Sequence, residues 1–263
     1  MLSKNKIKQI RSLSRRKERE ETSLFVAEGN RIVIDLLPLL RCRTLVMTEK
    51  FRKTLPDYHI EEVHAEEMII VDKEEIGKIS QQHTPQSALA VFYQPAYKLE
   101  TDSLKDRFSL MLDTVQDPGN LGAIIRIADW FGIEDIICSE ETADVYNPKT
   151  IQATMGAIGR VHVHYCNLCA LLDTIPGIPL FGAFLNGENI YRTPLPSTGI
   201  LLMGNEGNGI SPGVEQRVGR KLYIPNYPAG RKTSESLNVA MATAIICSEF
   251  RRQILTMPAT LSK

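Results

Sequence analysis

Residues 109–139, SLMLDTVQDPGNLGAIIRIADWFGIEDIICS, hold a complete strand–helix–strand unit, and this unit decides the fold. The segment opens with a short apolar run, which is typical of a buried strand. A Pro-Gly turn at 117–120 follows, and then a helix that Gly132 is expected to end. A second apolar run, 134–139, predicts the next strand.

The same alternation continues to the end of the chain. Apolar runs that predict further strands, several of them leading into glycine-containing loops, lie at 161–165, 178–185, 199–207 and 221–227. Helices are expected over 147–160 and 236–255. Repeated units of this kind predict an α/β domain with a mostly parallel sheet and helices on both faces. Ligands of such sheets bind at the carboxyl ends of the strands.

The N-terminal part predicts a second, smaller α/β domain. Ile7, Ile10 and Leu13 recur at helical spacing, so we expect one basic amphipathic helix over 3–20. The other elements expected here are strands at 23–28, 43–50 and 87–94, a helix over 30–40 that Pro38 disturbs, and a loop, strand and acidic helix within 55–71. The acidic residues between 61 and 75 are expected on a solvated helix surface. The polar segment 98–106 lacks periodicity, so we expect domains at 1–97 and 107–263 joined by a linker at 98–106.

Charge is distributed unevenly, although 31 basic and 31 acidic side chains give a net charge of zero. Residues 1–56 carry a net +8 and residues 57–106 a net −7. A basic N-terminal helix creates a potential that attracts phosphate backbones, but it is also what a solvated terminal helix looks like. The candidate RNA-binding residues are Lys8, Arg11, Arg15, Arg16, Lys17 and Arg19.

Composition excludes several classes of protein. With 43% hydrophobic and 24% charged residues, the 263-residue chain is an ordinary globular protein and not a disordered, collagen-like or coiled-coil one. No apolar run approaches the length of a membrane span, and the basic N-terminus lacks the apolar core of a signal peptide. Five cysteines, an odd number, favour a reduced cytoplasmic protein.

Three loops that follow strands carry polar side chains. In the first, Asn120 is expected just before a helix whose free amides suit an anion, and Arg126 is expected on a similar side. In the second, GNEGNGIS at 204–211, Glu206 lies between glycines. In the third, Ser236 is expected to cap the last helix and Asn238 to lie buried in its first turn. Each loop alone can also be explained by a helix cap or a turn, but together they predict one site.

These motifs resemble a known family. DPGNLGAIIRIAD, LLMGNEGNGIS and SLNVAMATAI are similar, in this order, to the three motifs of the SpoU/TrmH family of RNA ribose 2′-O-methyltransferases. The N-terminal KIKQIRSLSRRKEREETSLFVAEG and TPQSALAVF resemble that family's small RNA-substrate-binding domain. The likeness covers nearly the whole chain, although the loop between Ile224 and Ser236 is longer than is common and contains Arg231 and Lys232.

The resemblance implies a fold, a cofactor and an assembly. It implies a C-terminal SPOUT domain with a trefoil knot, S-adenosylmethionine as cofactor, and a homodimer with the site at the subunit interface. Ribosomal RNA is the favoured substrate and transfer RNA the alternative. The residues that it implicates in catalysis are Asn120, Arg126, Glu206, Ser236 and Asn238. Those that it implicates in cofactor binding are Gly204, Ile224 and Leu237.

Other interpretations have weaker support. His162, His164, Cys166 and Cys169 are zinc-ligand types, but their spacing matches no standard zinc motif, so we expect no metal. Nothing marks the two cysteines as the strand-to-helix turn of a redox pair. GISPG matches a hydrolase nucleophile motif, but Pro212 lacks the amide that the oxyanion needs. An oxidoreductase lacks its GxGxxG, and a non-catalytic RNA-binding protein would not need the polar loop residues.

Overall fold

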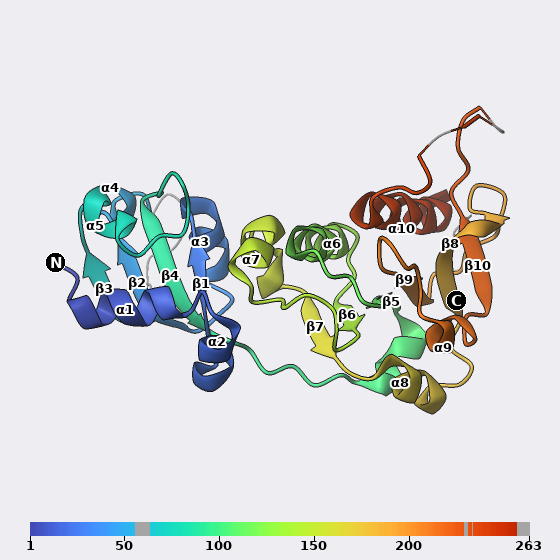
Figure 1. The fold of residues 1–263 in the computed structure, drawn as a ribbon, viewed down its shortest axis with the longest axis horizontal. Coiled ribbons are helices and arrows are strands. Elements are labelled where there is room, and N and C mark those ends of the chain that lie inside the picture. Colours follow the sequence, from blue (N-terminus) through green and yellow to red (C-terminus); the bar gives the residue numbers. More distant parts are fainter. Residues whose placement is uncertain (56–63, 229–230, 233, 257–263) are drawn as a thin grey trace. The chain divides into compact units, whose positions relative to one another are not determined.

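The computed structural model describes residues 1–55, 64–228, 231–232 and 234–256. The described residues form two compact units, each with its own sheet. One unit comprises Met1–Ala96 and Asp144–Arg160, and the other comprises Tyr97–Ala143 and the chain from Val161 onward (Figure 1). The domain boundaries at 97 and 107 stay a prediction, and the structure adds that residues 144–160 group with the first unit.

The first unit is a four-stranded sheet with short helices. Its strands are β1 (Leu24–Glu28), β2 (Cys42–Met47), β3 (Ala65–Ile70) and β4 (Ala88–Tyr93). Its helices are α1 (Lys4–Ser12), α2 (Arg16–Thr22), α3 (Asn30–Leu36), α4 (Glu49–Arg52), α5 (Lys73–Gly77), α7 (Pro148–Thr154) and the 3-10 helix η3 (Ala157–Gly159). The strand order is β1-β4-β2-β3, with only the β2–β3 pair parallel.

Two expectations about local structure in this unit are wrong. The single helix expected over 3–20 is two helices, because the chain turns at 13–15 and buries Leu13 in the core. Glu66 and Glu67, expected on a solvated helix, lie on strand β3, where Glu67 pairs with Lys6. The other acidic positions at 61 and 62 lie outside the described residues.

Arg19 explains why the chain turns between α1 and α2. Its guanidinium donates to the carbonyl oxygens of Leu13 and Ser14, each at 2.8 Å, and forms an ion pair with Asp144. The side chain is buried, with only 2% of the residue exposed. One buried cation therefore satisfies the carbonyl groups left free at the end of α1 and fixes the segment that leads into α7.

The second unit is a six-stranded sheet with helices on both faces. Its strands are β5 (Phe108–Leu112), β6 (Asp135–Cys138), β7 (His162–Tyr165), β8 (Leu180–Asn189), β9 (Gly199–Met203) and β10 (Arg220–Tyr223). Its helices are η2 (Thr101–Asp106), α6 (Pro118–Trp130), α8 (Leu168–Thr174), α9 (Pro212–Glu215) and α10 (Val239–Thr256).

All pairings in this sheet are parallel, in the order β10-β8-β9-β5-β6-β7. The predicted α/β class with a mostly parallel sheet is therefore confirmed. The trefoil knot stays a prediction. None of the described helices combines the length and apolar character that a bilayer crossing requires.

Alternate residues of the strands meet the two helical layers. Met111, Ile137 and Leu202 pack on one face against residues of α8, α9 and η2. On the other face, the ring of Phe250 in α10 contacts Phe108 and Phe181, with centroids 4.4 and 5.2 Å apart. Helix α6 lies beside α10 on that same face (Figure 1).

Helix boundaries follow the expected signals only in part. Gly132, with a positive φ of 62°, stops α6 as predicted. The helix expected over 147–160 ends instead at Thr154, because Met155 adopts a left-handed conformation. Helix α8 was not expected, although Asn167 caps it by accepting from the amide of Ala170.

The buried position of Arg19 yields a stability prediction. We expect Arg19→Ala to destabilise the first unit by about 3 kcal/mol, because it removes the cation paired with Asp144 and the donor of two carbonyl groups. Chemical denaturation followed by circular dichroism would measure this. Lys17→Ala, at an exposed residue of the same helix, should change the unfolding free energy by less than about 0.5 kcal/mol. Equal effects of the two substitutions would contradict this account.

Candidate active site

The loops that carry the predicted site residues leave the same edge of the second sheet. Asn120 follows β5, Glu206 follows β9, and Asn238 follows β10 and precedes α10. Because all six strands are parallel, their carboxyl ends lie at one edge. The fold therefore places these three loops where open α/β sheets bind ligands.

Asn120 lies inside α6 and not before it. Asp117 is the N-cap, its carboxylate accepting from the Asn120 amide at 2.8 Å, and Pro118 occupies the first helical position. The expectation that Asn120 precedes the helix is therefore wrong. Because Asp117 takes the capping role, the side-chain amide of Asn120 is available for other contacts.

Asn238, not Ser236, caps α10. Its Oδ1 accepts from the backbone amides of Ala240 and Met241 at 3.0 and 3.3 Å. The first helical hydrogen bond runs from Ala242 N to the carbonyl oxygen of Asn238. The expectation of a Ser236 cap and a buried Asn238 is corrected, since both residues are exposed and stand before the first turn.

A chain of hydrogen bonds joins the three loops. Asn238 Nδ2 donates to Asn120 Oδ1 at 2.9 Å, and Asn120 Nδ2 donates to Glu206 Oε1 at 2.6 Å. Both ends of the Asn120 amide are thus occupied, which fixes its orientation. The side chains of Asn120, Glu206 and Asn238 therefore meet, as predicted.

A turn organised by Asn205 presents Glu206. Asn205 Oδ1 accepts from the amides of Gly207 and Asn208, while its Nδ2 donates to the carbonyl oxygen of Thr114. A Cβ on Gly204 would lie 2.4 Å from the carbonyl carbon of Gly209, so only glycine fits there. Asn205 was not among the predicted site residues, although asparagine is favoured in turns because its side chain can bond the backbone two residues on, as it does here to Gly207.

The buried Asp113 fixes the far end of the same loop. Its Oδ2 accepts from the Ser211 amide at 2.7 Å, and its Oδ1 accepts from the Thr114 hydroxyl at 3.1 Å. Thr114 has a positive φ of 59°, which is uncommon for a β-branched residue. The GISPG segment is thereby held as the start of α9, with Ser211 as its cap.

Arg126 does not meet the other three residues within one chain. It lies six positions after Asn120 on α6, which corresponds to about 9 Å along the axis and roughly 120° around it. The expectation that it faces a similar side is therefore wrong. Its side chain is exposed and makes no hydrogen bond or ion pair with any other residue in the described ranges.

The residues expected to hold the cofactor surround the same loops. Gly204 directly follows β9, Ile224 follows β10 and is half-buried, and Leu237 directly precedes Asn238. Leu237 exposes 48% of its surface, so an apolar side chain is available there. Backbone and apolar groups of this kind fit an adenosine, whose faces are apolar and whose edges form hydrogen bonds.

The predicted RNA-binding residues differ in their surroundings. Arg19 is buried in an ion pair, so its assignment to RNA binding is corrected. Arg15, Arg16 and Lys17 are exposed but pair with Glu18, Glu20 and Glu21. Lys8 and Arg11 are exposed on α1 and have no ion-pair partner among the residues that the structure describes.

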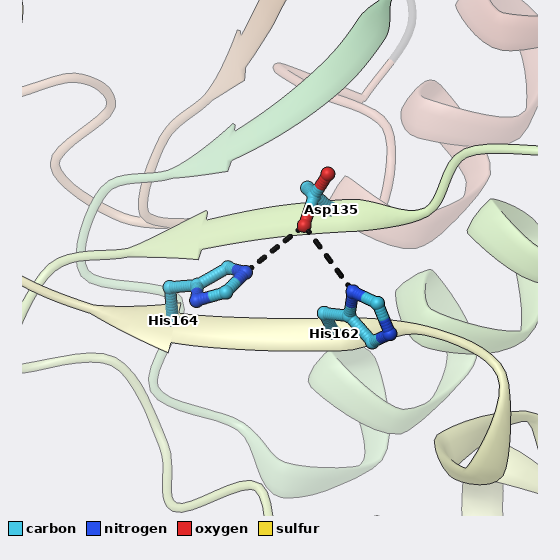
Figure 2. A group of neighbouring side chains, drawn as sticks. All are labelled: Asp135, His162 and His164. Carbon is cyan, nitrogen blue, oxygen red and sulfur yellow. Dashed lines mark hydrogen bonds and ion pairs between the residues drawn. The ribbon is translucent and has the colours of Figure 1, made fainter. Parts of the chain in front are cut away.

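The two histidines of β7 lie beside Asp135 and not beside the cysteines. Asp135 Oδ1 is 3.0 Å from His164 Nε2 and 3.5 Å from His162 Nδ1, and Figure 2 shows both rings directed at this carboxylate. The hydrogen bond from His164 is the main cause that lowers the pKa of Asp135. The zinc interpretation therefore grouped the histidines with the wrong partners.

Cys166 and Cys169 do lie at a strand-to-helix turn, contrary to expectation. Cys166 follows β7, and Cys169 belongs to the first turn of α8. Burial raises the pKa of the Cys166 thiol, which disfavours the reactive thiolate. A redox pair needs the opposite shift, so the structure gives this interpretation no support.

Comparison with known proteins places the chain in a family. Residues 107–248 match the model of the SpoU rRNA Methylase family, and residues 4–90 match an MRM3-like substrate binding domain. The 23S rRNA (guanosine(2553)-2′-O)-methyltransferase RlmP of Bacillus subtilis is 32% identical over 251 residues, which cover 94% of this chain and 96% of the relative.

Two solved structures share the fold over nearly the full length. A TrmH-family protein from Porphyromonas gingivalis is 42% identical, with a TM-score of 0.85, and the match covers 96% of this chain and 99% of that one. The AdoMet-bound rRNA methyltransferase of Sinorhizobium meliloti is 31% identical, with a TM-score of 0.82 and 97% coverage of each chain. The chain therefore belongs to the SpoU rRNA methylase family of S-adenosylmethionine-dependent RNA methyltransferases.

Proposed function

We propose that the protein, an S-adenosylmethionine-dependent RNA ribose 2′-O-methyltransferase, acts on ribosomal RNA where Asn120, Glu206 and Asn238 meet. The hydrogen-bond chain through these residues carries the proposal, because it assembles polar groups from three separate loops at the ligand-binding edge of the sheet. We also propose that the enzyme works in the cytoplasm, which suits five cysteines of which none forms a disulfide.

The cofactor supplies a methyl group on a positively charged sulfur, which is already activated for transfer. The protein has to align the ribose hydroxyl with that methyl group and remove the hydroxyl proton. Gly204, Ile224 and Leu237 would hold the cofactor through backbone and apolar contacts. No metal is needed for this reaction, and we expect none at this site.

Glu206 is the candidate general base. Asn120 binds its Oε1, and Oε2 has no hydrogen-bond partner within the described residues, so this oxygen can take the hydroxyl proton. A carboxylate is a better base than a guanidinium, which has five N–H donors and no acceptor for a proton. Asn120 and Asn238 would act as positioning residues that orient the carboxylate. The neighbouring Ser236 is exposed, and we assign it no role.

Arg126 fits a role across a subunit interface. It lies about 9 Å along α6 from Asn120 and on a different side of the helix, and a guanidinium near the reaction would bind phosphate and stabilise the developing alkoxide. Trp130 on α6 and Met241 on α10 are 84% and 64% exposed, and such apolar surface favours association. We therefore propose a homodimer in which Arg126 of one copy completes the site of the other.

Lysines and arginines of α1 form a basic stripe that would bind phosphates. Lys4, Lys8 and Arg11 recur at helical spacing, and with Ile7, Ser12 and Arg15 they line a shallow groove. The side chains of Lys4, Lys8 and Arg11 are exposed and have no ion-pair partner in the described part of the chain. A positive stripe of this kind recognises the RNA backbone and not its sequence, so the target nucleotide depends on other contacts.

Two alternatives remain to be tested. The enzyme could methylate transfer RNA, or the protein could bind RNA without methylating it. Labelled methyl transfer from S-adenosylmethionine to total RNA, followed by mapping of the modified ribose, separates the three. We expect label at one site in the large ribosomal RNA. Label in transfer RNA would contradict the proposal that ribosomal RNA is the substrate. Cofactor binding without methyl transfer to any RNA would contradict the proposed activity.

Substitution of the base tests the catalytic assignment. We expect Glu206→Gln to lower kcat by about 100-fold or more, because the amide cannot accept the hydroxyl proton. The KM for the cofactor should change only a few-fold. Glu141→Gln, at an exposed glutamate of the same unit, is the matched control and should keep full activity. A Glu206→Gln enzyme with a normal kcat would remove Glu206 from proton transfer.

A mixed dimer tests the role of Arg126. We expect Arg126→Ala and Glu206→Gln each to inactivate the enzyme as homodimers. A dimer with one chain of each kind, purified through two tags, should recover about half of the wild-type activity, because one of its two sites is intact. If Arg126 acts within its own chain, neither site of the mixed dimer is intact and no activity returns.

Neutralising the basic stripe tests RNA binding. We expect the triple variant Lys4→Gln, Lys8→Gln, Arg11→Gln to weaken binding and to reduce the salt slope of log K by roughly 2 to 3. Cofactor affinity should not change. The double variant Arg16→Gln, Lys17→Gln removes cations that already pair with Glu20 and Glu21, so its effect should be smaller. An unchanged salt slope in the triple variant would mean that α1 is only a solvated helix.

A further inference from the structure

Asp135, His162 and His164 form a cluster that the methyl transfer does not use. They lie on the neighbouring parallel strands β6 and β7, where Asp135 pairs with His162 and Ile137 pairs with His164. Side chains two apart on a strand share a face, so all three residues project from the same side of the sheet. Strand β7 is the last strand at this edge.

The potential ligand atoms of this cluster converge. Asp135 Oδ1 lies 3.0 Å from His164 Nε2 and 3.5 Å from His162 Nδ1, and all three atoms lie within 4.8 Å of one another (Figure 2). In a tetrahedral zinc site with bonds of about 2.05 Å, ligand atoms are about 3.3 Å apart. Two of the three separations already have this value to within 0.3 Å.

We propose that Asp135, His162 and His164 bind one divalent transition-metal ion, with zinc as the best match to the two imidazoles and one carboxylate. Each neutral imidazole would use the nitrogen that now faces Asp135 as the ligand and keep its proton on the other nitrogen. Among the described residues, this is the one group of three such side chains whose ligand atoms come so close together.

The surroundings fit a cation with one open position. Asp135 and His164 are buried, whereas the side chain of His162 is 38% exposed, so solvent can supply the fourth ligand on that side. The ring of Tyr97 stacks on His162 with centroids 4.0 Å apart, which restrains the more exposed ligand. Arg107 lies 3.7 Å from the other carboxylate oxygen of Asp135 and 2.5 Å from Glu134, so two carboxylates share this one cation and Asp135 Oδ1 still faces the two imidazoles.

The ion would have a structural role. Asp135 and His162 are the first residues of their strands, so the cluster lies at the amino ends of β6 and β7. The site of methyl transfer lies at the carboxyl ends of strands in the same sheet. A metal here would link the edge strand β7 to its neighbour and take no part in the reaction, so this proposal stands or falls independently of the proposed function.

Zinc titration of the purified full-length protein tests the site. We expect one equivalent of zinc to bind, measured by calorimetry and by elemental analysis after dialysis. At a hundredfold excess over Kd, zinc should raise the thermal transition by roughly 5 °C. His162→Ala removes the most exposed ligand and should weaken zinc binding by at least about 100-fold while leaving methyl transfer unchanged.

Three further variants separate this site from other sources of zinc binding. Cys166→Ser with Cys169→Ser, and His83→Ala at an exposed histidine of the first unit, should bind zinc like the wild type. His164→Gln should abolish both the binding and the thermal shift, with its circular dichroism confirming that it folds. No binding to the wild type, or zinc binding that survives in His162→Ala, would overturn the proposal.

Discussion

The arrangement of the site depends on a single capping interaction, the hydrogen bond from the Asn120 amide to the carboxylate of Asp117. A helix start needs a side-chain acceptor for its free amides, and Asp117 supplies it. If Asn120 had to cap the helix, its side chain would turn back toward the backbone and could not join Glu206 to Asn238. The geometry of the candidate site is therefore a consequence of which of two nearby polar residues, Asp117 or Asn120, caps a helix.

The sequence predicted the class of fold and the convergence of the loops, because both depend on patterns that are regular over many residues. Apolar runs such as 108–112 and 199–203 are too short for helices and are bounded by glycine or polar turns. Once the strands alternate with helices, a parallel sheet follows, and with it a common edge for Asn120, Glu206 and Asn238.

The predictions that were wrong concern helix caps, the burial of Arg19 and the partners of the histidines. Each of these depends on a single residue or on contacts between distant parts of the chain. Several capping residues stand near each helix start, so sequence alone did not distinguish Asp117 from Asn120, or Ser236 from Asn238. The charge of Arg19 indicated a surface residue, yet the carbonyl groups it satisfies make burial favourable. Nothing in the sequence around Asp135 indicated that it would lie opposite His162, because the register between two strands is not encoded locally.

The α6–α10 pair has a further consequence, since the two helices are joined at both ends. Asn238 contacts Asn120 near the start of each helix, and Arg251 donates to the carbonyl oxygens of Phe131 and Gly132 near the end of α6. The two helices therefore cannot separate without breaking the hydrogen bonds between Asn238 and Asn120 and those of Arg251. Loosening of the pair at its Asn238 end would therefore also release the side-chain amide of Asn120, which bonds to both Asn238 and Glu206.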